Sequence, residues 1–149
     1  MVFAEIKHHQ TNLLGEEYRA GCWSPSKELA GAVVQVQQTT HLASRELGDY
    51  IQDQSSEGEL LPTGTFLLQP KSFAILGSLD QLTGSIGGAI SDKVRSFELF
   101  RRSLHDPEVI TFDELVARAE WHVEAAASDT ASADAQEIND PWDAETDPW

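Results

Sequence analysis

The chain has 149 residues, one cysteine and a formal net charge of −15 at pH 7, so it can form a domain with one core but no internal disulfide. It holds neither an apolar run of the ~18 residues typical of a membrane span nor a signal-peptide pattern, which predicts a cytoplasmic protein. The charge is uneven, because residues 124–149 contain eight acids and no Lys, Arg or His. This acidity argues against coating nucleic acid through bulk charge but allows a local basic patch.

Hydrophobic periodicity predicts alternating strands and helices. A strand at 2–7 and a polar loop at 8–18 come first, and a helix from about 26 to 50 follows. Pro25 suits the start of this helix, and Ser24 or Ser26 can cap it. The later predicted elements are strands 65–69 and 72–77, a helix 93–104, a strand 109–112 and a helix 113–125. The order predicts an α/β fold, with a mixed sheet flanked by helices over residues 1–125.

The first strand carries the first chemically suggestive residues. Alternation places Val2, Ala4 and Ile6 on one face, which we expect to be buried. Glu5 and Lys7 lie on the other face, so their side chains are neighbours. A carboxylate can hold Mg²⁺, and a lysine can position or deprotonate a water or stabilise a negative transition state. The plain alternative is a strand with two solvated charges.

The helix at 26–50 adds a polar stripe. Glu28, Gln35 and Thr39 share one side of it by their spacing. If that side faces the first strand, Gln35 approaches the glutamate–lysine pair. Alternatively, Gln35 belongs to an exposed margin with Gln37 and Gln38, and both interpretations are open at this point.

Four stretches in this order resemble the nuclease domain of the Shedu anti-phage defence proteins, a branch of the PD-(D/E)xK superfamily, over residues 2–123. They are "FAEIKHHQTNLL", "SPSKELAGAVVQVQQT", "PKSFAILGSL" and "KVRSFELFRRSLHDPEVITFDELVARAE". The resemblance implies a restriction-endonuclease-like fold and a metal-dependent DNA endonuclease using Mg²⁺ or Mn²⁺. It implies that Glu5 is a metal ligand, Lys7 is catalytic and Gln35 positions the site. Position 39, where the family pattern often has tyrosine, is threonine.

The resemblance also implies a metal-binding aspartate on a strand before Glu5, and only four residues precede Glu5 in this sequence. Three explanations are open. The chain is a fragment of a longer protein, truncated at its N-terminus; or it is an inactive copy; or another carboxylate substitutes, with Glu28 the best placed second metal ligand. The functional alternative to an endonuclease is therefore an inactive nuclease-fold module that binds DNA or a partner protein.

The densest basic stretch lies in the helix at 93–104. Its cations, Lys93, Arg95, Arg101 and Arg102, are candidates for DNA-backbone contacts, with a solvated helix face as the alternative. His8 and His9 end the first strand and could touch phosphate or metal, although an exposed pair there usually has no function. "GSIGG" follows a strand but lacks G-K-[ST], so we reject a nucleotide site.

Residues 126–149 form a small, polar, acidic segment that predicts a disordered tail. The tail repeats "DPW" at 140–142 and 147–149. An acidic segment around tryptophan could dock on the basic, apolar groove of a partner. A homo-oligomer is a separate possibility for the chain. The alternative is a tail that only adds solubility.

Overall fold

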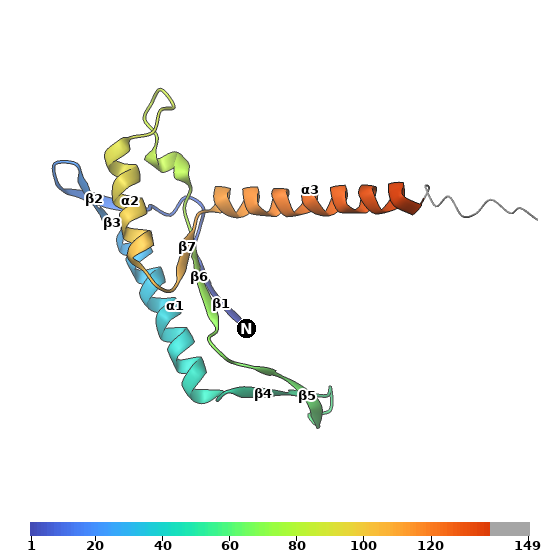
Figure 1. Cartoon of the computed structure of the whole chain (residues 1–149). Helices are drawn as coiled ribbons and strands as arrows, with labels where there is room; N and C mark the ends of the chain where they lie inside the picture. Colours follow the sequence, from blue (N-terminus) through green and yellow to red (C-terminus); the bar gives the residue numbers. More distant parts are fainter. Residues whose placement is uncertain (138–149) are drawn as a thin grey trace, which may run out of the picture. The chain divides into compact units, whose positions relative to one another are not determined.

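The computed structural model describes the backbone of residues 1–137 and the side chains of residues 1–127. The chain divides into two units, Met1–Glu114 and a second that begins at Leu115. The expected strand–helix alternation is present in the first unit (Figure 1). Its strands and helices, in chain order, are β1 (Val2–Ile6), β2 (Leu14–Arg19), β3 (Cys22–Pro25), α1 (Lys27–Glu46), β4 (Tyr50–Gln54), β5 (Leu60–Phe66), β6 (Lys71–Ile75), the 3₁₀ helix η1 (Leu79–Leu82), α2 (Ser91–Ser103) and β7 (Glu108–Ile110).

Helix α3 (Phe112–Glu137) begins in the first unit and continues into the second. It starts where the sequence predicts and extends beyond the expected end at residue 125. The predicted disordered tail therefore overlaps α3 up to residue 137, and its remainder, with both "DPW" segments, lies outside the described residues.

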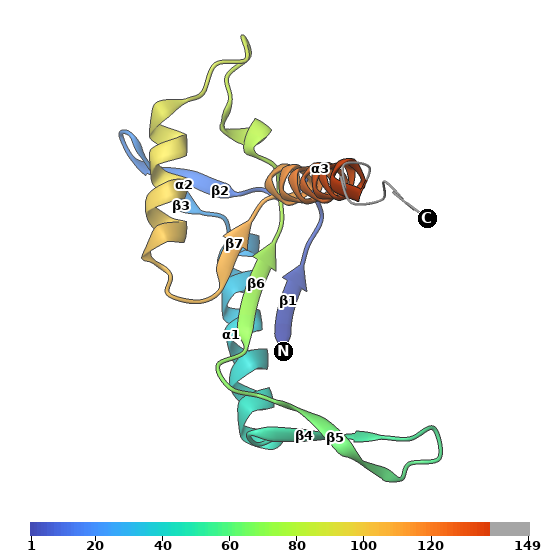
Figure 2. The same cartoon turned by 45° about the vertical axis from the view of Figure 1, so that its right-hand side comes forward.

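The central sheet has three parallel strands in the order β1–β6–β7, lying side by side in Figure 2. In the strand register, Glu5 of β1 pairs with Ala74 of β6, and Ala74 pairs with Val109 of β7. The other strands form two separate antiparallel pairs, β2–β3 and β4–β5. The α/β class is confirmed, and parallel and antiparallel pairing occur in different sheets rather than in one.

One face of the central sheet carries the core. Ala74 and Val109 point from that face into a cluster that includes Ala32 and Val33 of α1 and Phe97 of α2. Helices α1 and α2 thus pack on the same side of the sheet. Parallel strands need long crossover connections, and helical crossovers cover at least one face of such a sheet. Burying this apolar surface stabilises the fold at roughly 25 cal/mol per Å².

The predicted orientation of β1 is wrong. Val2 and Ile6 are each 61% exposed, and Ala4 is exposed too. Phe3 and Glu5 are half-buried instead, because they share the face of Ala74, on which α1 packs. The apolar residues of β1 occupy the open face of an edge strand, so hydrophobicity alone indicated the wrong side.

Helix α1 begins as expected, because the Ser26 hydroxyl caps it by accepting a hydrogen bond from the Leu29 amide at 2.9 Å. It ends earlier than predicted. Gly48 has a φ of +65°, a left-handed conformation that commonly follows a helix end and favours glycine. The following residues form the β4–β5 hairpin, which the sequence did not predict, since only Thr65 and Phe66 of β5 fall within the predicted strand at 65–69.

The β2–β3 hairpin was also missed, since its polar strand β2 resembles a loop in sequence. Gly21, with a φ of +72°, makes the turn between the strands. The Trp23 amide of β3 then donates a 3.1 Å hydrogen bond to the Ser96 hydroxyl of α2, so the hairpin is held against that helix. Within the described residues, no helix has the length and apolar character needed to cross a bilayer.

Candidate active site

Glu5 of β1 and Lys7, which follows the strand directly, form an ion pair. Glu5 Oε1 lies 3.0 Å from Lys7 Nζ, and the two side chains are 19% and 30% exposed. Both therefore sit at the margin of the helix-covered face, open enough to meet a ligand. The sequence prediction that these two groups meet on one face is confirmed, and the face is the one on which α1 packs.

The pair lies toward the carboxyl end of the parallel sheet, where the backbone is tightly connected. The Lys7 amide donates to the Ile75 carbonyl at 2.9 Å, and the His8 carbonyl accepts from the Gly77 amide at 3.2 Å. The Gly77 carbonyl accepts in turn from Phe112 at 3.0 Å. The ends of all three strands are thus linked, at the edge where open α/β sheets commonly bind ligands.

Gly77 shows how closely this region is packed. Its φ is +66°, and a Cβ atom there would lie 2.6 Å from Leu13 Cδ2 and 2.8 Å from the Thr11 carbonyl. Only glycine fits both the conformation and the space. The loop after β1 is therefore pressed against the end of β6, which fixes the position of the strand end beside Lys7.

The side of α1 on which Gln35 lies follows from Gln37. The Gln37 amide donates to the Asp106 carbonyl at 2.7 Å, just before β7. Residues that are two positions apart in a helix are separated by about 200° around its axis. Gln35 therefore lies on the flank of α1 opposite to Gln37. Because β1 is at the other edge of the sheet from β7, that flank is on the β1 side.

Gln35 and Glu28 are therefore on the correct flank but are exposed. Within the described part of the chain, the Gln35 side chain makes no hydrogen bond with Glu5 or Lys7. Glu28 lies in the first turn of α1. The structure brings together Glu5 and Lys7, while the positioning role of Gln35 and the metal role of Glu28 stay predictions.

The residues present do not by themselves complete a metal site. Within the described residues, no group of three or more His, Cys, Asp and Glu side chains is placed to hold a metal ion. Mg²⁺ needs near-octahedral oxygen ligands, normally one or two carboxylates together with waters and phosphate oxygens. Glu5 supplies one carboxylate, and its Oε1 is engaged with Lys7.

His8 and His9 follow the pair directly. Their rings lie 4.2 Å apart, and the His9 ring contacts Phe112 edge-on with the centroids 6.3 Å apart. His8 Nδ1 accepts a hydrogen bond from the Gln10 backbone amide at 3.1 Å. The pair belongs to the carboxyl edge of the sheet, and His9 has a packing partner there.

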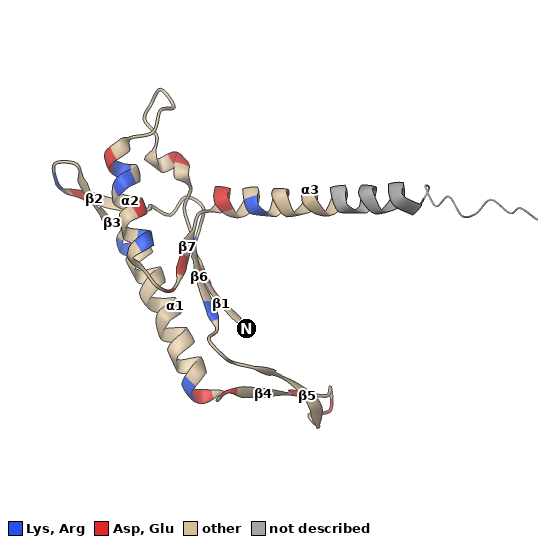
Figure 3. Ribbon diagram, in the orientation of Figure 1, with Lys and Arg blue, Asp and Glu red and all other residues tan. Residues whose placement is uncertain are grey.

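The four cations of α2 have different surroundings, and Figure 3 shows blue segments on this helix interspersed with red acidic ones. Arg101 Nη1 donates to both Glu114 oxygens at 2.8 Å, and its Nη2 donates to Glu98 at 2.6 Å. Arg102 pairs with Glu98 at 3.0 Å, and Arg95 forms an ion pair with Asp92. Of the predicted DNA contacts, Arg101 is thus committed to partners inside the first unit.

The Arg101–Glu114 pair is half-buried, and its pKa values record the balance of forces. Burial alone raises the pKa of Glu114, but hydrogen bonds from Thr111 and Arg101 outweigh it, so this pKa lies below its usual value. Burial lowers the pKa of Arg101, and the bonds to Glu114 and Glu98 outweigh that, so its pKa is raised. Both groups are held in their charged forms.

Glu114 also completes the start of α3. Its Oε2 accepts from the amide and the hydroxyl of Thr111, each at 3.0 Å. A glutamate at the third helical position that bonds back to the N-cap amide is half of a capping box. Thr111 and Glu114 thus stabilise the start of α3, and Glu114 joins it to Arg101 of α2.

Lys93 is placed differently from the three arginines. Its Nζ lies 4.7 Å from the centroid of the Trp23 ring, a cation–π arrangement. Lysine and tryptophan line a cavity of about 190 Å³ between β3, α2 and the loop after β1. Sequence reasoning identified Lys93 but missed Trp23, because β3 was not predicted. An aromatic residue in an otherwise polar stretch was the available signal.

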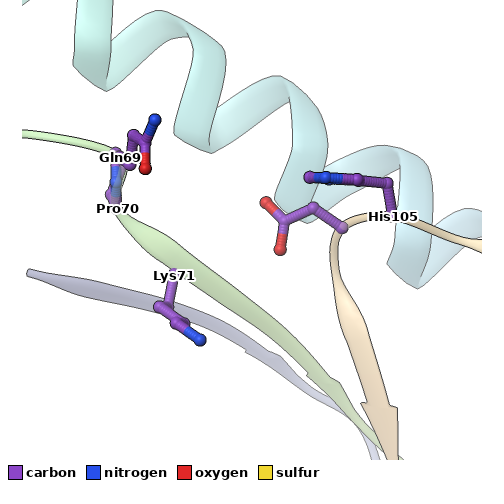
Figure 4. Close-up of a pocket in the computed structure, with 5 residues that line it drawn as sticks. Gln69, Pro70, Lys71 and His105 are labelled. Atoms are coloured by element: carbon purple, nitrogen blue, oxygen red, sulfur yellow. The ribbon is translucent and has the colours of Figure 1, made fainter.

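A larger cavity, of about 520 Å³, opens at the amino ends of β6 and β7. Its lining includes Gln69, His105 and Asp106, and Figure 4 shows Lys71 pointing away from His105. Gln69 has a φ of +46°, which is uncommon for a residue other than glycine. This cavity lies at the opposite end of the strands from Lys7, so it is not part of the Glu5–Lys7 site.

Comparison with known proteins gives two matches. The family model described as "Shedu protein SduA, C-terminal" matches residues 1–116. A curated protein, "Shedu protein SduA" from Bacillus cereus (strain B4264), is 36% identical over 118 residues. That alignment covers 78% of this chain and 29% of the relative, so the chain corresponds to less than a third of the relative's length.

Proposed function

We propose that this chain, which belongs to the Shedu protein SduA C-terminal family, carries part of the active site of a DNA endonuclease in an anti-phage defence system. The Glu5–Lys7 pair is the observation that carries the proposal. It lies within the matched residues, at the carboxyl edge of a parallel sheet. The resemblance of this segment to the PD-(D/E)xK superfamily supports assigning hydrolytic chemistry to the pair.

The roles proposed for the pair follow from its geometry. The Lys7 ammonium, held at 3.0 Å by the Glu5 carboxylate, is oriented rather than free to rotate. A fixed cation at the sheet edge stabilises the negative charge that develops on phosphate oxygens during hydrolysis of a phosphodiester. Gln35, on the same flank, would position a water or a phosphate oxygen after a change of side-chain rotamer.

The metal expected from the resemblance needs more ligands than the pair offers. We assign no step to Mg²⁺ or Mn²⁺ here, because Glu5 is a single carboxylate that already contacts Lys7. If Glu28 or a carboxylate from elsewhere joins Glu5, the set becomes suitable for a hard cation. We therefore expect weak cleavage from this chain by itself.

The alternative function is a nuclease-fold module that binds DNA or a partner protein without cutting. The incomplete ligand set within the described residues favours it. The Glu5–Lys7 pair favours the endonuclease. Its two charges are half-buried on the helix-covered face, and burying charge costs free energy that two fully solvated side chains would not lose.

The test is nicking of a supercoiled plasmid by the purified chain with Mg²⁺ or Mn²⁺. We expect slow nicking that is lost in Glu5→Gln and in Lys7→Met. Glu57→Gln and Lys27→Met are matched controls, because both residues are exposed and lie outside the site. Both controls should nick as the unchanged chain does.

Two outcomes would overturn the proposal. Nicking that survives both substitutions would place the active site elsewhere. DNA binding with no nicking at any protein concentration, by this chain and by a full-length family member, would establish the binding module instead. If the single substitution Glu28→Ala also abolishes nicking while the chain stays folded, α1 supplies the second metal ligand through Glu28.

A further inference from the structure

The Trp23–Lys93 cavity has the size and walls of a site for one flat ring. Its volume of about 190 Å³ is below the ~300–1,000 Å³ that enclose a drug-sized ligand. Besides Trp23 and Lys93, its lining includes Asn12, Leu14 and Gln81. An aromatic face, an aliphatic side chain and amide groups together suit a planar, polar heterocycle.

The walls of this cavity are fixed by hydrogen bonds. Gln81 uses both ends of its amide on the loop after β1, accepting from the Leu13 amide and donating to the Thr11 carbonyl, each at 2.9 Å. Trp23 is anchored through its backbone to Ser96 at 3.1 Å. The backbone that carries Trp23 is therefore held in place beside α2, so binding there does not have to order this strand.

Among the predicted DNA contacts, Lys93 is the half-buried cation whose charge is not neutralised by a carboxylate within the described residues. Arg95, Arg101 and Arg102 each have a carboxylate partner, whereas in the described part of the chain Lys93 forms no ion pair and contacts only an aromatic ring. A charge-assisted hydrogen bond to phosphate would replace only this cation–π contact, with no carboxylate pair to break within the described residues. A phosphate can therefore draw the ammonium from the ring face.

We propose that this cavity binds one nucleotide of single-stranded DNA, with the base stacked on Trp23 and the adjoining phosphate paired with Lys93. The inference rests on the proposed function for its ligand class, DNA, and adds the strand state and the contact residues. A base can stack on a protein ring only when it is unpaired or unstacked, so a duplex does not fill the cavity without distortion.

Local charge also favours a short contact over a long duplex track. Glu16 and Glu17 are exposed on β2, the strand paired with the one that carries Trp23. Asp92 lies next to Lys93 in sequence and is engaged by Arg95. Phosphates on either side of one bound nucleotide would meet this acidic rim, so we expect stacking, rather than summed charge, to supply the affinity.

The experiment uses the whole chain with Trp121, Trp142 and Trp149 replaced by phenylalanine, so that fluorescence reports Trp23 alone. We expect a short oligothymidylate to quench this fluorescence and the matched duplex to do so weakly. The Trp23 variants lack this reporter, so their affinity is measured from the anisotropy of a dye-labelled oligothymidylate. Trp23→Ala should weaken single-strand binding roughly 5- to 100-fold, the equivalent of one lost base stack, and Trp23→Phe should retain most of it.

A second variant tests the charge. Lys93→Ala should reduce the slope of log affinity against log salt by about one unit, as expected when one phosphate contact is lost, and the Lys27→Ala control should not. Thermal melting establishes that each variant is folded. If Trp23→Ala does not fold, the inference is decided by the quenching of Trp23 fluorescence and by the DNA affinities of Trp23→Phe and Lys93→Ala.

Unchanged fluorescence, wild-type affinity in folded Trp23→Ala, or equal affinity for duplex and single strand would each overturn the inference. Plasmid nicking separates this failure from failure of the proposed function. Nicking that depends on Lys7 but not on Trp23 would leave the endonuclease standing and remove only the nucleotide site. Absence of all DNA binding would remove both.

Discussion

Two charged regions of the first unit look similar in sequence and differ in structure. On α2, Arg101 donates three hydrogen bonds to two acids, one to each oxygen of Glu114 and one to Glu98. Directly after β1, Lys7 has one carboxylate partner, Glu5. The first region is a satisfied network that also caps α3, while the second is a single pair beside a ligand-binding edge.

The partners of a cation, rather than the density of charge around it, decide what that cation can do. The basic stretch of α2 was the best sequence candidate for binding DNA, yet Arg101 is used to join α2 to the start of α3. Lys7, directly after β1, has a single partner within the described residues and a half-buried ammonium at the carboxyl edge of the sheet. We therefore expect α2 substitutions to change stability and β1 substitutions to change chemistry.

The largest effect is expected from Glu114→Ala. The change removes the partner of Arg101 and the acceptor for Thr111, leaving half-buried donors unsatisfied. We expect the free energy of unfolding to fall by about 2–4 kcal/mol, measured by urea denaturation. Glu120→Ala, an exposed glutamate of the same helix, should stay within about 0.5 kcal/mol, and an equal loss there would contradict the account.

A smaller effect is expected with pH. The pKa of Glu114 is lower in the folded chain than its usual value of 4.5, so the folded state favours the carboxylate. Its contribution to stability is therefore complete above that value and is lost as the pH falls through the folded pKa. Unfolding free energies of the wild type and Glu114→Gln should differ most near neutral pH and converge in acid. A constant difference would show that this pKa is not shifted.

The smallest effect is expected from Arg102→Ala. This side chain is 78% exposed, and its pair with Glu98 is mostly solvated. Exposed pairs contribute about 0–1 kcal/mol and are screened by salt. We expect a change in unfolding free energy below about 0.5 kcal/mol that disappears in high salt. A loss comparable to that of Glu114→Ala would extend the satisfied network to Arg102.

The parts of the fold that sequence predicted have strong local signals. Ser26 begins α1 as expected, and the strand at β6 and the helix at α2 lie within two residues of their predicted starts. The missed strands β2 and β4 are polar and exposed on most positions, so their pairing partners rather than their own periodicity make them strands.

The site was predictable only in part. Spacing of two along a strand was sufficient to bring Glu5 to Lys7. It could not show which face of β1 is covered, because that depends on α1 packing over an edge strand. Nor could it show that Arg101 is satisfied by Glu114, since the two are separated by β7 and meet only when α2 and the start of α3 are in place.

The contrast between the two regions is tested most directly by the free energy of unfolding of two matched variants, Lys7→Met and Arg101→Met, in urea at neutral pH. Methionine keeps much of the aliphatic length of both side chains and removes the charge. The account predicts that Lys7→Met stays within about 1 kcal/mol of the wild type, while Arg101→Met loses about 2–4 kcal/mol. A larger loss for Lys7→Met than for Arg101→Met would contradict it, because the Glu5–Lys7 pair would then be structural.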